Sequence, residues 1–132
     1  MLDEYIVGNV DRISPEAPIP VLDVKKISSV LGGAASTAHN IRSLGNAVVV
    51  AGVIGRDESG EILKRSLQEK GISAQGVIVD NERKTTIKTR VLSQGQQIIR
   101  IDIEDRNPVS QRIEAEIVDF VSEARSASSL NA

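Results

Sequence analysis

Two adjacent glycines, Gly32 and Gly33, stand immediately before a segment with the apolar spacing of a helix. The first turn of a helix exposes backbone N–H groups and a partial positive charge, and glycine lets a ligand approach without a Cβ in the way. Such a site suits sugar hydroxyls or an anion. Ordinary turn chemistry explains the same pair, so both interpretations stay open. The pair is neither a dinucleotide fingerprint nor a P-loop, because no third glycine falls at the required spacing and no Gly-Lys-Ser/Thr follows.

A second set of candidates is a group of cations on a predicted β-hairpin. Between residues 86 and 103 the hydrophobic pattern has a period of two and is interrupted by Gln94-Gly95, which favours two strands and a turn. Lys88 and Arg90 lie on one side of the first strand, and Arg100 lies on the second. Arginine offers a planar fork for phosphate oxygens and lysine a point charge. The pattern alone fits a solvated charged face as well as a binding site.

The elements that must position these residues alternate between strand and helix, which favours an α/β fold. Three prolines in the run from Arg12 to Val21 forbid helix and predict an extended, rigid connection between two strands. Expected strands are 4–9, 19–27, 47–54 and 77–79, and expected helices begin at 34, at Asp57 or Ser59 as N-cap, and at Ser110 as N-cap.

Composition indicates one soluble domain. The chain has 132 residues, a net charge of −2, no cysteine and only Tyr5 and Phe120 as aromatics. This balance argues against a nucleic-acid surface, which uses basic patches and stacking rings. No apolar run approaches the ~20 residues of a membrane span, so no membrane partner is expected. His39 is the single histidine and makes no metal site by itself. We expect a cytoplasmic protein.

Five segments together resemble the N-terminal part of the ribokinase (PfkB) family of sugar kinases: residues 1–5, 12–21, 32–40, 52–57 and 85–102. Within that family, the Arg-Ile-Ser-Pro-Glu-Ala-Pro and Lys-x-Arg-Val-Leu-Ser runs resemble the heptose-7-phosphate kinase domain of the bifunctional ADP-heptose synthesis proteins. The resemblance implies part of a ribokinase-like three-layer α/β sandwich, with a small lid made by strands 4–9 and 19–27. It covers residues 1–121, which we expect to be the N-terminal part of a kinase domain, and leaves 122–132 as an unmatched tail.

The resemblance also implies roles for individual residues. Asp3 would accept hydrogen bonds from sugar hydroxyls, and Gly32 and Gly33 would let the sugar approach the backbone. Ser36 stands where the family usually has asparagine, and Asn40 lies one helical turn further. The cations implied for the phosphate already on the substrate are Lys88, Arg90 and Arg100, with Arg12 as a weaker fourth candidate. Asp102 is expected to orient Arg100.

Other parts of the family's active site have no counterpart in these 132 residues. The family's catalytic base is the aspartate of a Gly-Ala-Gly-Asp motif, which is absent here, as is the Asn-x-x-Glu element linked to Mg²⁺. We therefore assign no catalytic and no metal-binding residue, and expect ATP and Mg²⁺ to serve the complete enzyme. The substrate implied is D-glycero-D-manno-heptose 7-phosphate, phosphorylated at C1 for lipopolysaccharide core synthesis.

Two alternatives to that assignment stay open. The chain could belong to another PfkB-type sugar kinase, or it could be a non-catalytic module that binds a sugar phosphate or dimerises. The apolar residues of the lid strands fit either a homodimer interface or burial against the chain's own core.

Overall fold

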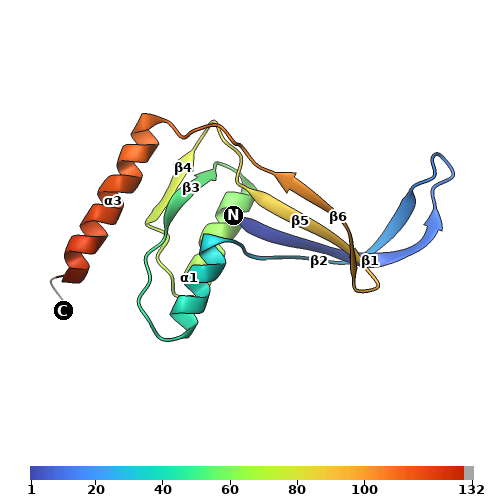
Figure 1. Ribbon diagram of the computed structural model, residues 1–132, viewed down its shortest axis with the longest axis horizontal. Coiled ribbons are helices and arrows are strands. Elements are labelled where there is room, and N and C mark those ends of the chain that lie inside the picture. Colours follow the sequence, from blue (N-terminus) through green and yellow to red (C-terminus); the bar gives the residue numbers. More distant parts are fainter. Residues whose placement is uncertain (130–132) are drawn as a thin grey trace.

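The computed structural model describes residues 1–129, which fold into two sheets and three helices (Figure 1). The elements in chain order are β1 (Leu2–Ile13), β2 (Pro20–Leu31), α1 (Ala34–Ser43), β3 (Ala51–Gly55), α2 (Glu58–Glu69), β4 (Gly76–Asp80), β5 (Ile87–Ser93), β6 (Gln96–Ile103) and α3 (Gln111–Ser129). The expected α/β class is confirmed.

One sheet contains the lid strands and the predicted hairpin together, in the order β2-β1-β5-β6. β1 pairs antiparallel with β2 and parallel with β5, and β5 pairs antiparallel with β6. The predicted turn joins β5 to β6 at Gln94 and Gly95, whose φ angles are 50° and 78°. Two consecutive positive φ angles are typical of a type I′ turn, whose twist matches that of the flanking strands.

The lid strands are longer than predicted and extend past the rest of their sheet. β5 ends at Ser93 opposite Gly8, so the remainder of β1 and the start of β2 form a two-stranded arm (Figure 1). The hydroxyl of Ser93 accepts a hydrogen bond from the backbone N–H of Val10 at 3.2 Å, where the arm leaves the sheet. A register shift between Val7 and Gly8 lies at the same point.

The proline-rich connection is only partly as predicted. Its first and last residues belong to the strands, but residues 14–19 form a compact loop at the tip of the arm. The N–H of Ser14 bonds to the carbonyl of Ile19 at 2.8 Å and closes this loop. The prolines exclude helix, as expected, yet they also suit turns. The loop therefore reverses the direction of the chain and is not the extended connection that was predicted.

The second sheet has two strands, β3 and β4, paired parallel from Ala51–Gly76 to Gly55–Asp80. The strand expected over 47–54 was placed too early, because pairing with β4 begins only at Ala51. β4 agrees with the expected strand at 77–79. The core lies between this sheet, α1, α2 and the first residues of β1, and comprises Leu2, Leu31, Ala35, Ala38, Ile54, Leu63, Leu67, Ile72 and Val77.

Asp57, one of the two predicted candidates, is the N-cap of α2, and it also connects two segments. Its Oδ1 accepts the N–H of Gly60 at 2.8 Å and the hydroxyl of Thr85 at 2.6 Å, while Oδ2 accepts the N–H of Thr85 at 2.8 Å. The hydroxyl oxygen of Thr85, a residue only 1% exposed, accepts the N–H of Gly55 at 3.0 Å. This cluster joins β3, α2 and the segment entering β5.

α3 begins after Ser110, whose hydroxyl accepts the N–H of Ile113 at 3.4 Å, in line with the predicted cap. The helix packs against β4 so closely that a Cβ at Gly76 would lie 2.3 Å from Cε1 of Phe120. The segment expected to be an unmatched tail, 122–132, continues α3 as far as Ser129; residues 130–132 lie outside the described residues. No helix within residues 1–129 is long and apolar enough to span a membrane.

Candidate functional site

The strand register gathers most of the predicted binding residues on one face of the four-stranded sheet. Asp3 of β1 pairs with Lys88 of β5, which pairs with Asp102 of β6. The next row on the same face runs from Tyr5 through Arg90 to Arg100. Because residues paired across a ladder share a face, these side chains form one surface. We call these six residues, Asp3, Tyr5, Lys88, Arg90, Arg100 and Asp102, the charged face.

Asp3 is held between Arg90 and the backbone of Gly32. Nη1 of Arg90 donates to Oδ1 of Asp3 at 2.8 Å, and both side chains are at least three-quarters buried. A Cβ at Gly32 would lie 2.9 Å from Oδ2 of Asp3, so only glycine allows this approach. The ion pair raises the pKa of the Arg90 guanidinium, chiefly through the hydrogen bond to Asp3. Asp3 thus presents a fixed carboxylate next to the start of α1.

The start of α1 has the open geometry expected from its two glycines. Gly33 is the N-cap with φ 53° and ψ −129°, a conformation that favours glycine, and no side chain caps the helix. The N–H of Ala35 bonds to the carbonyl of Gly32 at 3.2 Å, and that of Thr37 bonds to Gly33 at 3.1 Å. This terminus lies beside Asp3, so a hydroxyl-rich ligand could contact both.

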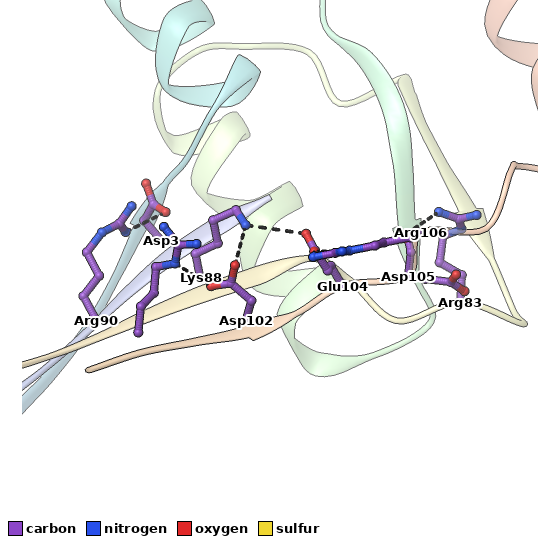
Figure 2. Close-up of polar contacts among 9 residues, drawn as sticks. Asp3, Arg83, Lys88, Arg90, Asp102, Glu104, Asp105 and Arg106 are labelled. Carbon is purple, nitrogen blue, oxygen red and sulfur yellow. Dashed lines mark hydrogen bonds and ion pairs between the residues drawn. The ribbon is translucent and has the colours of Figure 1, made fainter. Parts of the chain in front are cut away.

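Lys88 and Arg100 share Asp102 as a counter-ion. Nζ of Lys88 lies 2.8 Å from Oδ2 of Asp102 (Figure 2). Nε of Arg100 lies 2.9 Å from Oδ1 of the same carboxylate. Lys88 also lies 3.5 Å from Glu104, whose other partner is Arg106 at 2.7 Å. The hydrogen bond from Lys88 lowers the pKa of Asp102, and the hydrogen bond from Arg106 lowers that of Glu104. The cations are therefore held in place on one surface.

A second polar cluster lies beyond this surface, where β6 leads into α3 (Figure 2). Arg83 donates to the backbone carbonyls of Asp105, at 3.4 Å, and Asn107, at 2.8 Å, and its Nε lies 3.6 Å from Asp80. These residues line a cavity of about 510 Å³ with the first turn of α3. The contacts attach the β6–α3 connection to the end of β4, which is a structural role.

Three predicted binding residues lie away from the charged face. Ser36 and Asn40 line a separate cavity of about 450 Å³ with His39 and the end of α2. Nδ1 of His39 lies 2.9 Å from the hydroxyl of Ser43 on the next turn of α1. Arg12 lies on the arm, past the last residue of β1 that pairs with β5. The structure thus brings together Asp3, Gly32, Gly33, Lys88, Arg90 and Arg100.

Tyr5 is the member of the charged face that sequence reasoning missed. Its ring centre lies 5.6 Å from Cζ of Arg90, within the range of a cation–π contact. A signal was present, since Tyr5 is two residues after Asp3 and must share its face in any strand. The contacts of Glu104 with Lys88 and Arg106 were also missed.

The sequence pattern of pfkB family carbohydrate kinases matches residues 3–127. The chain belongs to this family. Among curated relatives, "Bifunctional protein HldE" from Geobacter metallireducens is 48% identical over 123 residues, and that from Helicobacter pylori J99 is 45% identical over 121. These matches cover 92–93% of the chain and 25–26% of the relatives, so the chain spans about a quarter of their length.

Solved structures confirm the ribokinase-like fold for this pfkB family chain. The ribokinase of Arabidopsis thaliana, complexed with ribose and ATP, matches 77% of the chain with a TM-score of 0.62 and 20% identity. The match covers 32% of that ribokinase. A sugar kinase from Pyrococcus horikoshii in complex with ATP matches 79% of the chain, and 32% of its own length, with a TM-score of 0.56 and 22% identity.

The described residues do not contain a set of side chains that could bind a metal ion. Within residues 1–129, no group of three or more histidine, aspartate or glutamate side chains could hold one. The carboxylates of the charged face are instead paired with lysine and arginine. We assign no Mg²⁺ ligand to the described part of the chain.

Proposed function

We propose that this chain forms the sugar-phosphate-binding side of the active site of an ATP-dependent carbohydrate kinase. The proposed substrate is D-glycero-D-manno-heptose 7-phosphate, phosphorylated at C1 in the synthesis of ADP-heptose for the lipopolysaccharide core. Support for heptose comes from the sequence resemblance to heptose-7-phosphate kinases and from the HldE relatives. We place the reaction in the cytoplasm, where ATP is available.

The observation that carries the proposal is the composition of the charged face. A sugar phosphate needs acceptors for its hydroxyls and cations for its phosphate. Asp3 is the acceptor beside the open start of α1, and Lys88, Arg90 and Arg100 are cations on the same face. Their acidic partners hold them in position before the ligand arrives, which reduces the cost of ordering long side chains on binding.

NMR mapping tests where the ligand binds. We expect heptose 7-phosphate, titrated to millimolar concentration, to shift backbone amide signals at the starts of β1 and α1 and along β5 and β6. A matched titration with a different sugar phosphate reports specificity. Shifts confined to the cavity beside Arg83, or to the one that Ser36 and Asn40 line, would contradict the proposed location.

We further propose that the 132-residue chain binds the sugar phosphate but does not catalyse phosphoryl transfer. Transfer depends on charge neutralisation around the γ-phosphate, which the family achieves with its Gly-Ala-Gly-Asp motif and bound Mg²⁺. We therefore expect the 132-residue chain to release no ADP above background when supplied with heptose 7-phosphate, ATP and Mg²⁺. A coupled ADP-release assay measures this directly. Turnover that persists after repurification would show that the chain holds a complete site.

We also propose that the chain forms a homodimer through the lid strands β1 and β2, with a second copy covering the part of the opposite face of the four-stranded sheet that the core leaves exposed. The register places a row of apolar residues there, across all four strands: Ile27, Ile6, Val91 and Ile99. Ile101 and Ile103 extend it along β6, and these two and Ile27 and Ile99 are 41–61% exposed. Where the four strands pair within residues 1–129, Glu4 is the charged residue on this face. Its carboxylate accepts a hydrogen bond from the hydroxyl of Thr89 at 2.9 Å.

Charge insertion on this face tests the dimer. We expect Ile101→Glu to raise the dimer dissociation constant by about a hundredfold, because each copy would bury an unpaired carboxylate. Gln97→Glu is the matched control, since Gln97 is exposed on the same strand but pairs with Leu92 outside the apolar row. Sedimentation equilibrium gives both constants. Equal effects of the two substitutions, or a monomeric parent chain, would overturn the proposed interface.

A further inference from the structure

Tyr5 and Asp3 contact the guanidinium of Arg90 from two positions on β1. Tyr5 is the direct partner of Arg90 in the parallel β1–β5 pairing, and its ring centre lies 5.6 Å from Cζ. Asp3, two residues earlier on the same strand and face, accepts from Nη1 at 2.8 Å. One side chain from β5 is therefore held by a carboxylate and by an aromatic ring at the same time.

The two contacts use Arg90 in different ways. A guanidinium has five N–H donors in a fixed plane, and the ion pair with Asp3 occupies one nitrogen. The aromatic contact is made through the face of the ring's π-system and consumes no donor. The remaining N–H groups stay available to an anion. Without the ring, the long side chain would regain rotamers that point those donors elsewhere.

We propose that Tyr5 is a positioning residue for phosphate recognition: its ring fixes the plane of the Arg90 guanidinium, so that Arg90 bonds to Asp3 and presents its free N–H groups to the substrate phosphate. This inference rests on the proposed sugar-phosphate function. Tyr5 itself need not touch the ligand. Its contribution lies in the aromatic ring and not in its hydroxyl.

Two substitutions separate the ring from the hydroxyl. Tyr5→Phe keeps the ring and removes only the hydroxyl, so we expect wild-type affinity for heptose 7-phosphate. Tyr5→Leu keeps apolar bulk and removes the π-system, so we expect about fivefold weaker binding of heptose 7-phosphate. Affinity for the unphosphorylated heptose should stay unchanged in Tyr5→Phe and should fall less than that for heptose 7-phosphate in Tyr5→Leu, because a looser Arg90 also holds Asp3 less firmly. In an Arg90→Ala background, Tyr5→Leu should have no further effect, because there is no guanidinium left to position.

A measurement without ligand keeps this inference separate from the proposed function. NMR relaxation of the Arg90 Nε–H group should show faster, wider motion in Tyr5→Leu and unchanged motion in Tyr5→Phe. The inference would be overturned if Arg90 moved no more in Tyr5→Leu than in the wild type. It would also be overturned if Tyr5→Phe and Tyr5→Leu lost equal affinity for heptose 7-phosphate, or if Tyr5→Leu lost equal affinity for the two sugars. If Tyr5→Leu increases the motion of Arg90 but the wild-type chain binds both sugars with equal affinity, then the positioning role of Tyr5 holds and the proposed phosphate site is wrong.

Discussion

Replacing Asp57 by alanine is expected to lower the free energy of unfolding by about 3 kcal/mol, the sum of a lost N-cap and a buried hydroxyl left without its acceptor. Asp57 accepts three hydrogen bonds, one from Gly60 and two from Thr85. Thr85 is almost fully buried, so water cannot replace the lost partner. Urea denaturation of the two proteins at neutral pH measures the difference.

The neighbouring residue provides a control for this prediction. Glu58 is exposed in the first turn of α2 and does not cap the helix, so Glu58→Ala should change stability by less than about 0.5 kcal/mol. A loss for Asp57→Ala as small as that of the control would mean that the connection between α2 and Thr85 contributes little to stability.

The contribution of Asp57 should also depend on pH. Burial acts to raise the pKa of Asp57, but the hydrogen bonds from Thr85 and Gly60 outweigh it, and the pKa is lowered in the folded chain. A lowered pKa stabilises the fold fully above the unfolded value of about 4, and this stabilisation is lost as the pH falls through the folded value. The difference in free energy of unfolding between the wild type and Asp57→Ala should therefore become smaller at acidic pH.

Replacing Arg90 by alanine is expected to weaken binding of heptose 7-phosphate about tenfold or more, because a charge-assisted contact of roughly 1.5 to 3 kcal/mol is lost. The loss should be smaller for the unphosphorylated heptose, which lacks the group that Arg90 is proposed to bind. Isothermal titration calorimetry with both sugars measures the two losses.

Arg12→Ala is the matched control for Arg90→Ala. It removes the same side chain from the arm, away from the charged face, and should leave both affinities unchanged. Part of any loss in Arg90→Ala will reflect release of Asp3, which affects both sugars alike. If the two sugars lose affinity equally, Arg90 serves only to hold Asp3, and the phosphate is bound elsewhere.

The sequence predicted those parts of the fold that depend on local pattern. The period of two from residue 86 to 103 predicted β5 and β6, and Gln94-Gly95 predicted their turn. The same period placed Lys88 and Arg90 on one face, which the strand register confirms. Local pattern sufficed because side chains in a strand alternate between its faces whatever the strand pairs with.

Features that depend on pairing between distant segments could not be predicted in this way. The run at 47–54 is apolar throughout and contains three consecutive valines, but its strand begins only where β4 offers a partner, at Ala51. The bonds of Thr85 to Asp57 join residues 28 apart, and the contact of Tyr5 with Arg90 depends on the parallel register of β1 and β5. Helical spacing placed Ser36 and Asn40 on one helix face but could not show which cavity that face lines.

The central claim is that the charged face recognises the phosphate of a phosphorylated sugar. The most direct test compares the affinity of the wild-type chain for heptose 7-phosphate with its affinity for the same heptose without phosphate, by calorimetry at low and at moderate salt. We expect the phosphorylated sugar to bind at least about tenfold more tightly, with a preference that falls as salt screens the exposed charges. Equal affinities at low salt would contradict the account.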